Sequence, residues 1–346
     1  MSDNLRILYL CPVDISLVRG SSVNELEFIK ALCEEYGNAV HVIVPEPRQP
    51  LSIELPEQVT AWSRFGRFFP NALENQLAVF KPRHVEQEIQ RLQPTLLLVK
   101  STALPFKVCA VLKRLDIPVA LKTFEYSDFL ERRGRKFNKL VGSMLQHWHY
   151  YCVKDVLTRV DVIDVCSEAI KKTTISCFGI RENKIKVVMN AVNTNIFTPA
   201  LRKQSLENPF SEYLIGYAGG DTGRRGGRQV IELVYALRGM GFRVRGQILG
   251  PEDKQLLELA RELHVEKYLD VIGLVPYHEV PDYMAYWDIG LAFDDIERCQ
   301  QVGNSYQKVR QYISCGAYVL TYGVGAEFIE ENGLGALVRP DDIEKM

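Results

Sequence analysis

The sequence predicts an α/β protein with two doubly wound domains, and three observations lead to this prediction. Short apolar runs alternate with helical patterns along the chain, which is typical of parallel sheets covered by helices. A chain of 346 residues is longer than a domain with a single hydrophobic core usually is, and its length suits two domains. The alternation stops at a polar stretch and then starts again. We therefore expect a first domain at 1–199, a linker at 200–209 and a second domain at 210–346.

The expected strands are short runs of apolar residues, and the expected helices are the amphipathic stretches between them. First-domain strands are expected at 6–11, 39–44, 95–99, 118–122, 160–165 and 184–188, with helices at 22–35, 84–92, 106–115 and 139–159. Second-domain strands are expected at 213–218, 243–249, 269–272, 288–292, 317–320 and 336–338, with helices at 227–240, 253–263, 279–286 and 306–315. Ligands of such sheets bind beyond the carboxyl ends of the strands, so we expect the site in a cleft where the two domains face each other.

Composition narrows the class of protein. The net charge of −1 argues against a general nucleic-acid binder. The eight cysteines form no CxxC pair and no metal-ligand spacing, which indicates buried free thiols in a reducing cytosol. The N-terminus lacks the pattern of a signal peptide, and no apolar run is long enough to span a membrane. These observations predict a cytoplasmic protein.

The segment from Asn304 to Leu320 predicts a polar turn, a helix, a glycine stop and a buried strand. Asn304 and Ser305 are good N-cap residues, and free amides at a helix N-terminus form an anion site. Lys308 and Gln311 lie three residues apart, so they share one face of that helix. A cation and a carboxamide there suit a phosphate with a sugar hydroxyl beside it. Alone, the segment would favour an ordinary surface helix that leads into a core strand.

A glycine-rich loop follows the first strand of the second domain. Residues 219–227 contain five glycines together with Arg224 and Arg225. Glycine lets a phosphate approach the backbone, and guanidinium groups match phosphate oxygens in pairs. We therefore expect a ligand-binding loop here rather than a solvated turn.

The loop before the first helix of the chain carries a weaker signal of the same kind. Gly20, Ser21 and Ser22 precede a helical pattern, so their amides are suited to an anion. Ser22 and Glu25 also fit a capping box, which would make this an ordinary capped turn. Both interpretations remain open from the sequence.

Four stretches, in the correct order, resemble motifs of the retaining GT-B glycosyltransferases of family 4, which move a sugar from a nucleotide donor to an acceptor. KIKVVMNAVNTNIFTP at 184–199 is similar to the "I-V-I-P-N-G-V-D…F-P" bridge between domains, and GYAGGDTGRRG at 216–226 to the "G-x-x-G-R…K-G" loop. DVIGLV with VPDY, at 270–283, and SYQKVRQYISCGAYV, at 305–319, resemble the two following motifs. The resemblance runs nearly end to end and implies the GT-B fold, with two Rossmann-like domains.

The resemblance also implies roles at the matching positions. Arg225 takes the place of the lysine that holds the donor diphosphate, and Arg224 supplies a second charge. Gln311 stands where a glutamate binds the ribose. The implied donor-binding residues are Gly20, Ser21, Gly219, Gly220, Asp221, Val271, Leu274, Asn304, Ser305, Lys308 and Gln311.

The implied mechanism is electrostatic stabilisation of the departing nucleotide diphosphate, while the acceptor attacks the same face of the sugar. It needs no metal and no cofactor, so Asp294 and Asp295 are interpreted as a solvated loop rather than a cation site. The chain departs from the family pattern at three donor positions, because Gly220 replaces an arginine and Gly303 and Gln311 replace paired glutamates. Relatives usually continue into a C-terminal helix that returns to the first domain, which we expect to be missing here.

The resulting expectation is a retaining glycosyltransferase that uses a nucleotide-diphosphate sugar and a glycan, lipid-linked or small-molecule acceptor. Two alternatives stay open: a catalytically impaired GT-B-like protein that binds a nucleotide, a glycan or a partner subunit, and an epimerase or phosphorylase of similar architecture. The basic stretch 131–150, which carries an apolar helical stripe, either contacts the inner face of an anionic membrane or packs its stripe into the core.

Overall fold

The computed structural model describes part of the chain: residues 4–16, 20–51, 54–62, 82–100, 116–123, 150–151, 153–199, 212–220, 222–223, 225–294, 296, 299, 303 and 306–343. The chain divides into two compact units, the first made mainly of residues up to Val188 and the second mainly of residues from Met189 onward. Each unit contains one parallel sheet with helices, which confirms the predicted fold class. The predicted linker, the predicted helix 106–115 and all of the basic stretch 131–150 except Tyr150 lie outside the described residues.

In the first unit, the described strands form a parallel sheet in the order β3-β2-β1-β4-β5-β6-β7. Their bounds are β1 Ile7–Leu10, β2 Val40–Pro45, β3 Val59–Trp62, β4 Leu96–Lys100, β5 Val119–Thr123, β6 Val162–Val165 and β7 Ile185–Val187. Six of these strands were predicted, and β3 was missed. β3 is an edge strand whose side chains are half-buried or exposed, so it lacks a continuous apolar run.

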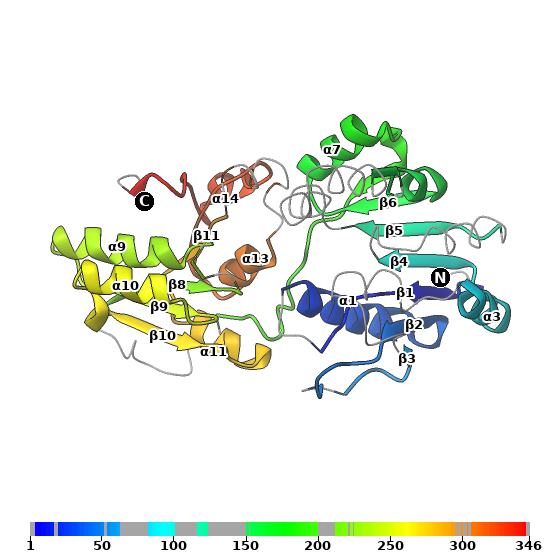
Figure 1. Ribbon diagram of the computed structural model, residues 1–346, viewed down its shortest axis with the longest axis horizontal. Helices are drawn as coiled ribbons and strands as arrows, with labels where there is room; N and C mark the ends of the chain where they lie inside the picture. The colour runs from blue at the N-terminus through cyan, green and yellow to red at the C-terminus, as the bar shows by residue number, and fades with distance from the viewer. Residues whose placement is uncertain are drawn as a thin grey trace, which may run out of the picture. The chain divides into compact units, whose positions relative to one another are not determined.

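The described helices of the first unit are α1 Gly20–Tyr36, α3 Pro82–Leu92 and α7 Glu168–Phe178. Figure 1 shows α1 alongside β1 and β2, and its Ile29 and Cys33 pack into the core with Tyr9. Because α1 already begins at Gly20, Ser22 and Glu25 lie inside the helix. The capping-box interpretation of this pair is therefore wrong.

In the second unit, the described strands form a parallel sheet in the order β10-β9-β8-β11-β12-β13. Their bounds are β8 Tyr213–Ala218, β9 Val244–Leu249, β10 Leu269–Gly273, β11 Ile289–Ala292, β12 Tyr318–Thr321 and β13 Gly335–Leu337. The helices are α9 Gly227–Gly239, α10 Lys254–Glu262, α11 Val280–Met284, α13 Gln307–Ser314 and α14 Phe328–Glu331. All six predicted strands are present.

Two cores cover the two faces of this second sheet. The α9 and α10 helices pack on one face, whereas α13 packs on the other face with Trp287 and Tyr312 (Figure 1). Glycines in the strands make room for these large rings: a Cβ atom on Gly216 would lie 1.9 Å from the Trp287 ring, and one on Gly290 would lie 2.5 Å from the Tyr312 ring. The sheet can therefore carry bulky aromatic residues directly against its backbone.

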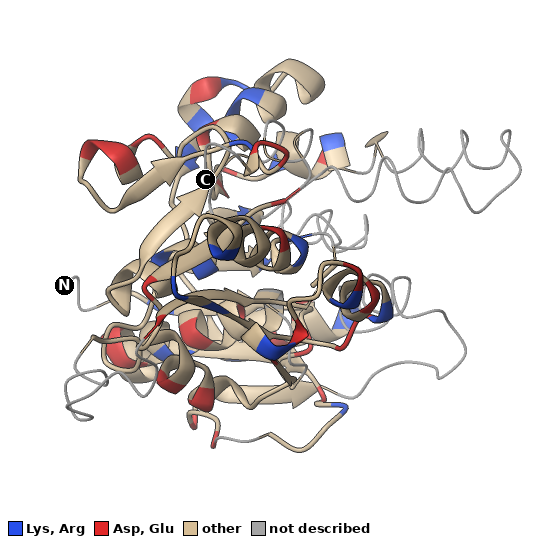
Figure 2. Ribbon diagram, turned by 90° about the vertical axis from the view of Figure 1, so that its left-hand side faces the viewer, with Lys and Arg blue, Asp and Glu red and all other residues tan. Residues whose placement is uncertain are grey.

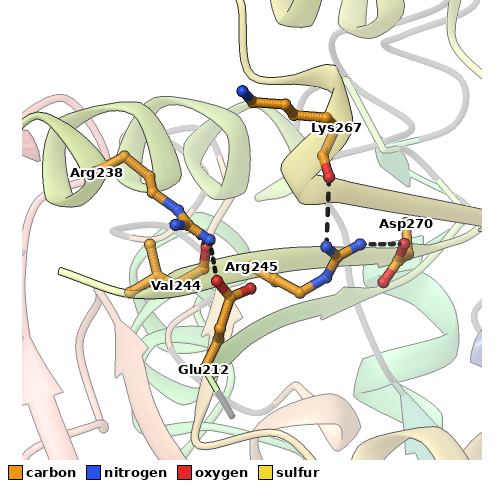
Figure 3. Close-up of polar contacts among 6 residues, drawn as sticks. All are labelled: Glu212, Arg238, Val244, Arg245, Lys267 and Asp270. Carbon is orange, nitrogen blue, oxygen red and sulfur yellow. Dashed lines mark hydrogen bonds and ion pairs between the residues drawn. The ribbon is translucent and has the colours of Figure 1, made fainter. Parts of the chain in front are cut away.

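Two arginines form polar contacts at the amino ends of β8, β9 and β10 (Figure 3). Arg238 contacts Glu212 at 2.7 Å and donates from Nε to the Val244 carbonyl at 2.8 Å. Arg245 contacts Asp270 at 2.8 Å and donates to the Lys267 carbonyl at 3.3 Å. This amino-edge network is structural and lies at the end of the sheet opposite to the carboxyl ends of the strands.

Among the described residues, the burial of the cysteines differs from the prediction at one position. Five of the described cysteines are buried, but Cys177 is exposed, so the expectation of uniformly buried thiols is wrong there. None of the described helices is both long and apolar enough for a membrane span. Basic and acidic positions are interspersed along the helices in Figure 2.

Candidate functional site

Glycines follow three neighbouring strands at the carboxyl edge of the second sheet. Gly219 comes after β8, Gly250 after β9, and Gly273 ends β10. The Gly219 amide donates to the Leu249 carbonyl at 2.9 Å, and the Gly250 amide donates to the Gly273 carbonyl at 2.9 Å. These hydrogen bonds continue the sheet ladder past the strand ends. They align three loop backbones at glycines, so no side chain covers the backbone there. A ligand phosphate can approach such a backbone closely.

Lys308 lies against this glycine row. Its ammonium is 3.3 Å from the Tyr217 hydroxyl and 4.3 Å from the centre of the Tyr217 ring. A Cβ atom on Gly219 would lie 2.6 Å from the Tyr217 hydroxyl and 2.9 Å from the Lys308 ammonium, so a side chain there would displace these groups. The first turn of α13 therefore places a cation directly beside the phosphate-loop backbone.

Arg225 adds a second cation at the same edge. Its Nε lies 3.4 Å from Oδ2 of Asp294, just beyond β11, and the Tyr306 hydroxyl donates to the same oxygen at 3.1 Å. The Asp294 side chain is only 2% exposed, so its interpretation as a solvated loop is wrong. Phe293, the residue before Asp294, is also buried. The Arg225 guanidinium and the Tyr306 hydroxyl compensate the charge of the buried Asp294 carboxylate. We call Gly219, Arg225 and Lys308 the cationic corner.

The start of α13 differs from the prediction. The residue before its first turn is Tyr306, which makes no side-chain cap, instead of Asn304 or Ser305. The helix does end as predicted, because Gly316 has a φ of 87°. The Tyr312 hydroxyl accepts a hydrogen bond from the Ala218 amide at 3.0 Å, which holds α13 against the end of β8.

Gln311 is 7% exposed, and its amide forms no hydrogen bond with any described residue. The residue shares α13 with the half-buried Lys308 but is nearly enclosed. A ligand hydroxyl can form a hydrogen bond with this amide.

Of the other predicted donor-binding residues, the structure describes some and leaves the rest outside its described part. Val271 lies in β10, and Leu274 is 65% exposed just past Gly273, at the carboxyl edge. A Cβ atom on Gly220 would meet no atom within 4 Å, and the same holds for Gly20, which begins α1. Outside the described part of the chain lie Arg224, Asp221, Asn304, Ser305, Asp295 and the side chain of Ser21.

The first unit contains a buried ion cluster that the sequence analysis missed. Glu25 of α1 meets the ammonium of Lys100 at 2.8 Å and that of Lys122 at 3.2 Å, and its second carboxylate oxygen accepts a hydrogen bond from the Tyr9 hydroxyl. The Glu25 side chain is fully buried. Lys100, Lys122 and Asp164 are register neighbours on three adjacent strands, so Asp164 lies beside the cluster.

Burial and charge oppose each other within this cluster. Burial alone would raise the pKa of Glu25, but Lys100 and Lys122 outweigh it and hold that pKa below its ordinary value. Burial lowers the pKa of Lys122, against the attraction of Glu25. Burial also raises the pKa of Asp164 to about 6, although Lys122 and Lys100 pull it down.

Asp164→Asn is expected to stabilise the protein more at pH 8 than at pH 5. The folded-state pKa of Asp164 lies above the ordinary value of 3.8, so its ionisation costs stability as the pH rises from about 4 to about 6. Asparagine has no charge to bury, so its advantage is complete above that window. Hydrogen exchange of β6 peptides at both pH values measures this difference. An advantage that stays constant with pH would contradict the prediction.

Among the described residues, no three His, Cys, Asp or Glu side chains are grouped as metal ligands. The positive charge at the carboxyl edge of the second sheet is supplied by the side chains of Arg225 and Lys308.

Comparisons with known proteins agree with the two sheets. The family described as Glycosyltransferase Family 4 matches residues 18–196, more than half of the chain. No curated protein sequence matches. Sucrose-phosphate synthase from Thermosynechococcus elongatus is similar in structure, with a TM-score of 0.68 and 14% identity over 98% of this chain and 87% of that one.

Two further solved structures are similar over most of their length. WaaG, a glycosyltransferase involved in lipopolysaccharide biosynthesis, has a TM-score of 0.68 and 13% identity, covering 98% of this chain and 88% of that one. Anabaena HepE, solved in complex with UDP, has a TM-score of 0.66 and 14% identity, covering 97% and 86%. At such identities the structures show a shared GT-B fold.

Proposed function

The chain belongs to glycosyltransferase family 4, and we propose that it transfers a sugar from a nucleotide-diphosphate sugar to a glycan, lipid-linked or small-molecule acceptor with retention. The observation that carries this proposal is the cationic corner. Lys308 lies beside the bare backbone of Gly219, and Arg225 lies at the same sheet edge. A diphosphate needs this combination of open amides and cations.

The proposed chemistry is the stabilisation of charge on the leaving group. When the bond between the sugar and the diphosphate breaks, negative charge grows on the phosphate oxygens. Lys308 and Arg225 stabilise that charge most in the transition state, which lowers the barrier. Two side-chain cations supply the charge that a divalent metal would otherwise provide, so the proposal includes no metal.

The remaining donor contacts follow from the same edge of the sheet. Gln311 offers its side-chain amide to the ribose hydroxyls, and the exposed Leu274 offers an apolar surface to the base. HepE was solved with UDP, which makes UDP the first nucleotide to test, with GDP beside it.

Arg225→Gln is expected to weaken UDP or GDP binding about tenfold to a hundredfold, because a charged hydrogen bond contributes about 1.5–3 kcal/mol. Calorimetric titration of the purified protein measures the affinity. Arg261→Gln, at an exposed position on α10, is the matched control and should bind like the wild type.

Turnover separates an enzyme from a binding protein. With a panel of nucleotide sugars and acceptors, we expect nucleotide release that depends on the acceptor and is lost in Arg225→Gln. Nucleotide binding without such release would favour the catalytically impaired alternative. Wild-type affinity in Arg225→Gln would remove the basis of the proposed site.

A further inference from the structure

We propose that Asp294 is a positioning residue that sets the Arg225 guanidinium for the donor diphosphate. The inference rests on the proposed function, and it assigns a role to a buried carboxylate that binds no donor group itself. Three separate stretches meet at this carboxylate: the loop before α9, the end of β11 and the residue before α13. Asp294 therefore joins the parts that carry both cations.

The backbone on both sides of this contact is tightly fixed. Gly226, the neighbour of Arg225, has a φ of 121°, and a Cβ atom there would lie 2.6 Å from the Tyr217 ring. Lys308 stacks on the same ring. Tyr217 thus restricts the positions of the Arg225 backbone and the Lys308 ammonium. The orientation of the Arg225 guanidinium then depends on its contact with Asp294.

The contact leaves the guanidinium available. Its closest approach to Asp294 is through Nε, the inner nitrogen, at 3.4 Å, and the Arg225 side chain is 28% exposed. Arg225 forms no side-chain hydrogen bond with the described residues, so these residues leave its N–H donors available. An ion pair without hydrogen bonds orients the group through charge and keeps its N–H donors for a phosphate.

This role predicts the opposite sign from simple electrostatics. If Asp294 only added negative charge near a diphosphate, its removal would strengthen nucleotide binding. If it positions Arg225, its removal frees a long side chain to adopt other rotamers, and the affinity falls. The direction of the change in affinity therefore decides between the two roles.

The test measures UDP or GDP affinity of Asp294→Asn and Arg225→Gln, singly and together. We expect Asp294→Asn to weaken binding about tenfold, within the range of coupled neighbours. In the Arg225→Gln background the same change should have no effect, because the group that it positions is gone. Tyr306→Phe, which removes only the hydroxyl donor to Asp294, should weaken binding in the same direction and by less. It also serves if Asp294→Asn does not fold.

Asp270→Asn is the matched control, because Asp270 forms an ion pair with Arg245 in the amino-edge network (Figure 3). It breaks an Asp–Arg pair of the same unit away from the carboxyl edge and should leave nucleotide affinity unchanged. In turnover, Asp294→Asn should lower kcat/KM for the donor and leave the acceptor KM unchanged.

The outcomes separate the two proposals. Arg225→Gln with wild-type affinity overturns the proposed donor site. A weakened Arg225→Gln together with tighter or unchanged binding in Asp294→Asn overturns only the positioning role. Equal losses from Asp294→Asn in both backgrounds also overturn it, because Asp294 would then act without Arg225.

Discussion

Replacing Glu25 with alanine is expected to destabilise the first unit by about 3–5 kcal/mol, the cost of leaving buried charges without their partner. Lys100 and Lys122 both direct their ammonium groups at the same Glu25 oxygen, and their side chains are only 7% and 13% exposed. Alanine removes the carboxylate and leaves two cations side by side in the core. The Tyr9 hydroxyl loses its acceptor as well.

Hydrogen exchange resolved to the peptides of β1, β4 and β5 measures this effect, because a chain of two units need not unfold in one step. Protection of these strands should fall by about a hundredfold or more, since each 1.4 kcal/mol corresponds to a factor of ten. Glu34→Ala, at an exposed position of the same helix, is the control and should change stability by less than about 0.5 kcal/mol. Equal protection in wild type and Glu25→Ala would show that the cluster adds no net stability.

The same variant carries a pH signature. The pKa of Glu25 is lower in the folded protein than its ordinary value of 4.5, so the carboxylate contributes stability above that value. The contribution is lost as the pH falls through the folded-state pKa. The difference between wild type and Glu25→Ala should therefore be full at pH 7 and shrink in acid.

The strands could be predicted because a parallel sheet buried on both faces needs continuous apolar runs, and these are visible locally. The edge strand β3 shows the limit, because half of its side chains face solvent and the run is interrupted. The family match covers residues 18–196, whereas the motifs that suggested the family from the sequence lie mainly after residue 184. The two signals come from different parts of the chain.

The ion cluster was missed because no local pattern connects its members. Lys100 and Lys122 each end an apolar run, and only strand register makes them neighbours. Glu25 fitted a capping box until the helix was found to begin earlier. The signal that the sequence did offer was a charged residue at the end of a buried strand. Three adjacent strands each carry such a residue. Asp294 gave the same signal after β11, and its burial could be recognised only from the surrounding fold.

Gly250→Ala is expected to disturb both folding and nucleotide binding in the second unit. The Gly250 φ of 151° is a conformation that L side chains rarely adopt, and an added Cβ atom would lie 2.1 Å from the Gly219 carbonyl oxygen and 2.6 Å from Thr222 Cγ2. Strain of this kind costs about 1–3 kcal/mol. The glycine-rich loop can relieve the clash only by moving away from β9, which separates the Gly219 backbone from the Lys308 ammonium.

Thermal unfolding and UDP or GDP titration of Gly250→Ala test the two parts of this prediction, with affinity expected to fall about tenfold, because a charged contact of about 1.5–3 kcal/mol is displaced. Gly239→Ala is the matched control: its added Cβ atom would meet nothing within 4 Å, and Gly239 is an exposed residue at the end of α9. Alanine there should be neutral or stabilise the unit by up to about 1 kcal/mol. Should Gly250→Ala bind nucleotide like the wild type while Arg225→Gln does not, the phosphate contacts would depend on the arginine alone. The alignment of the glycine backbones would then have no part in holding the donor.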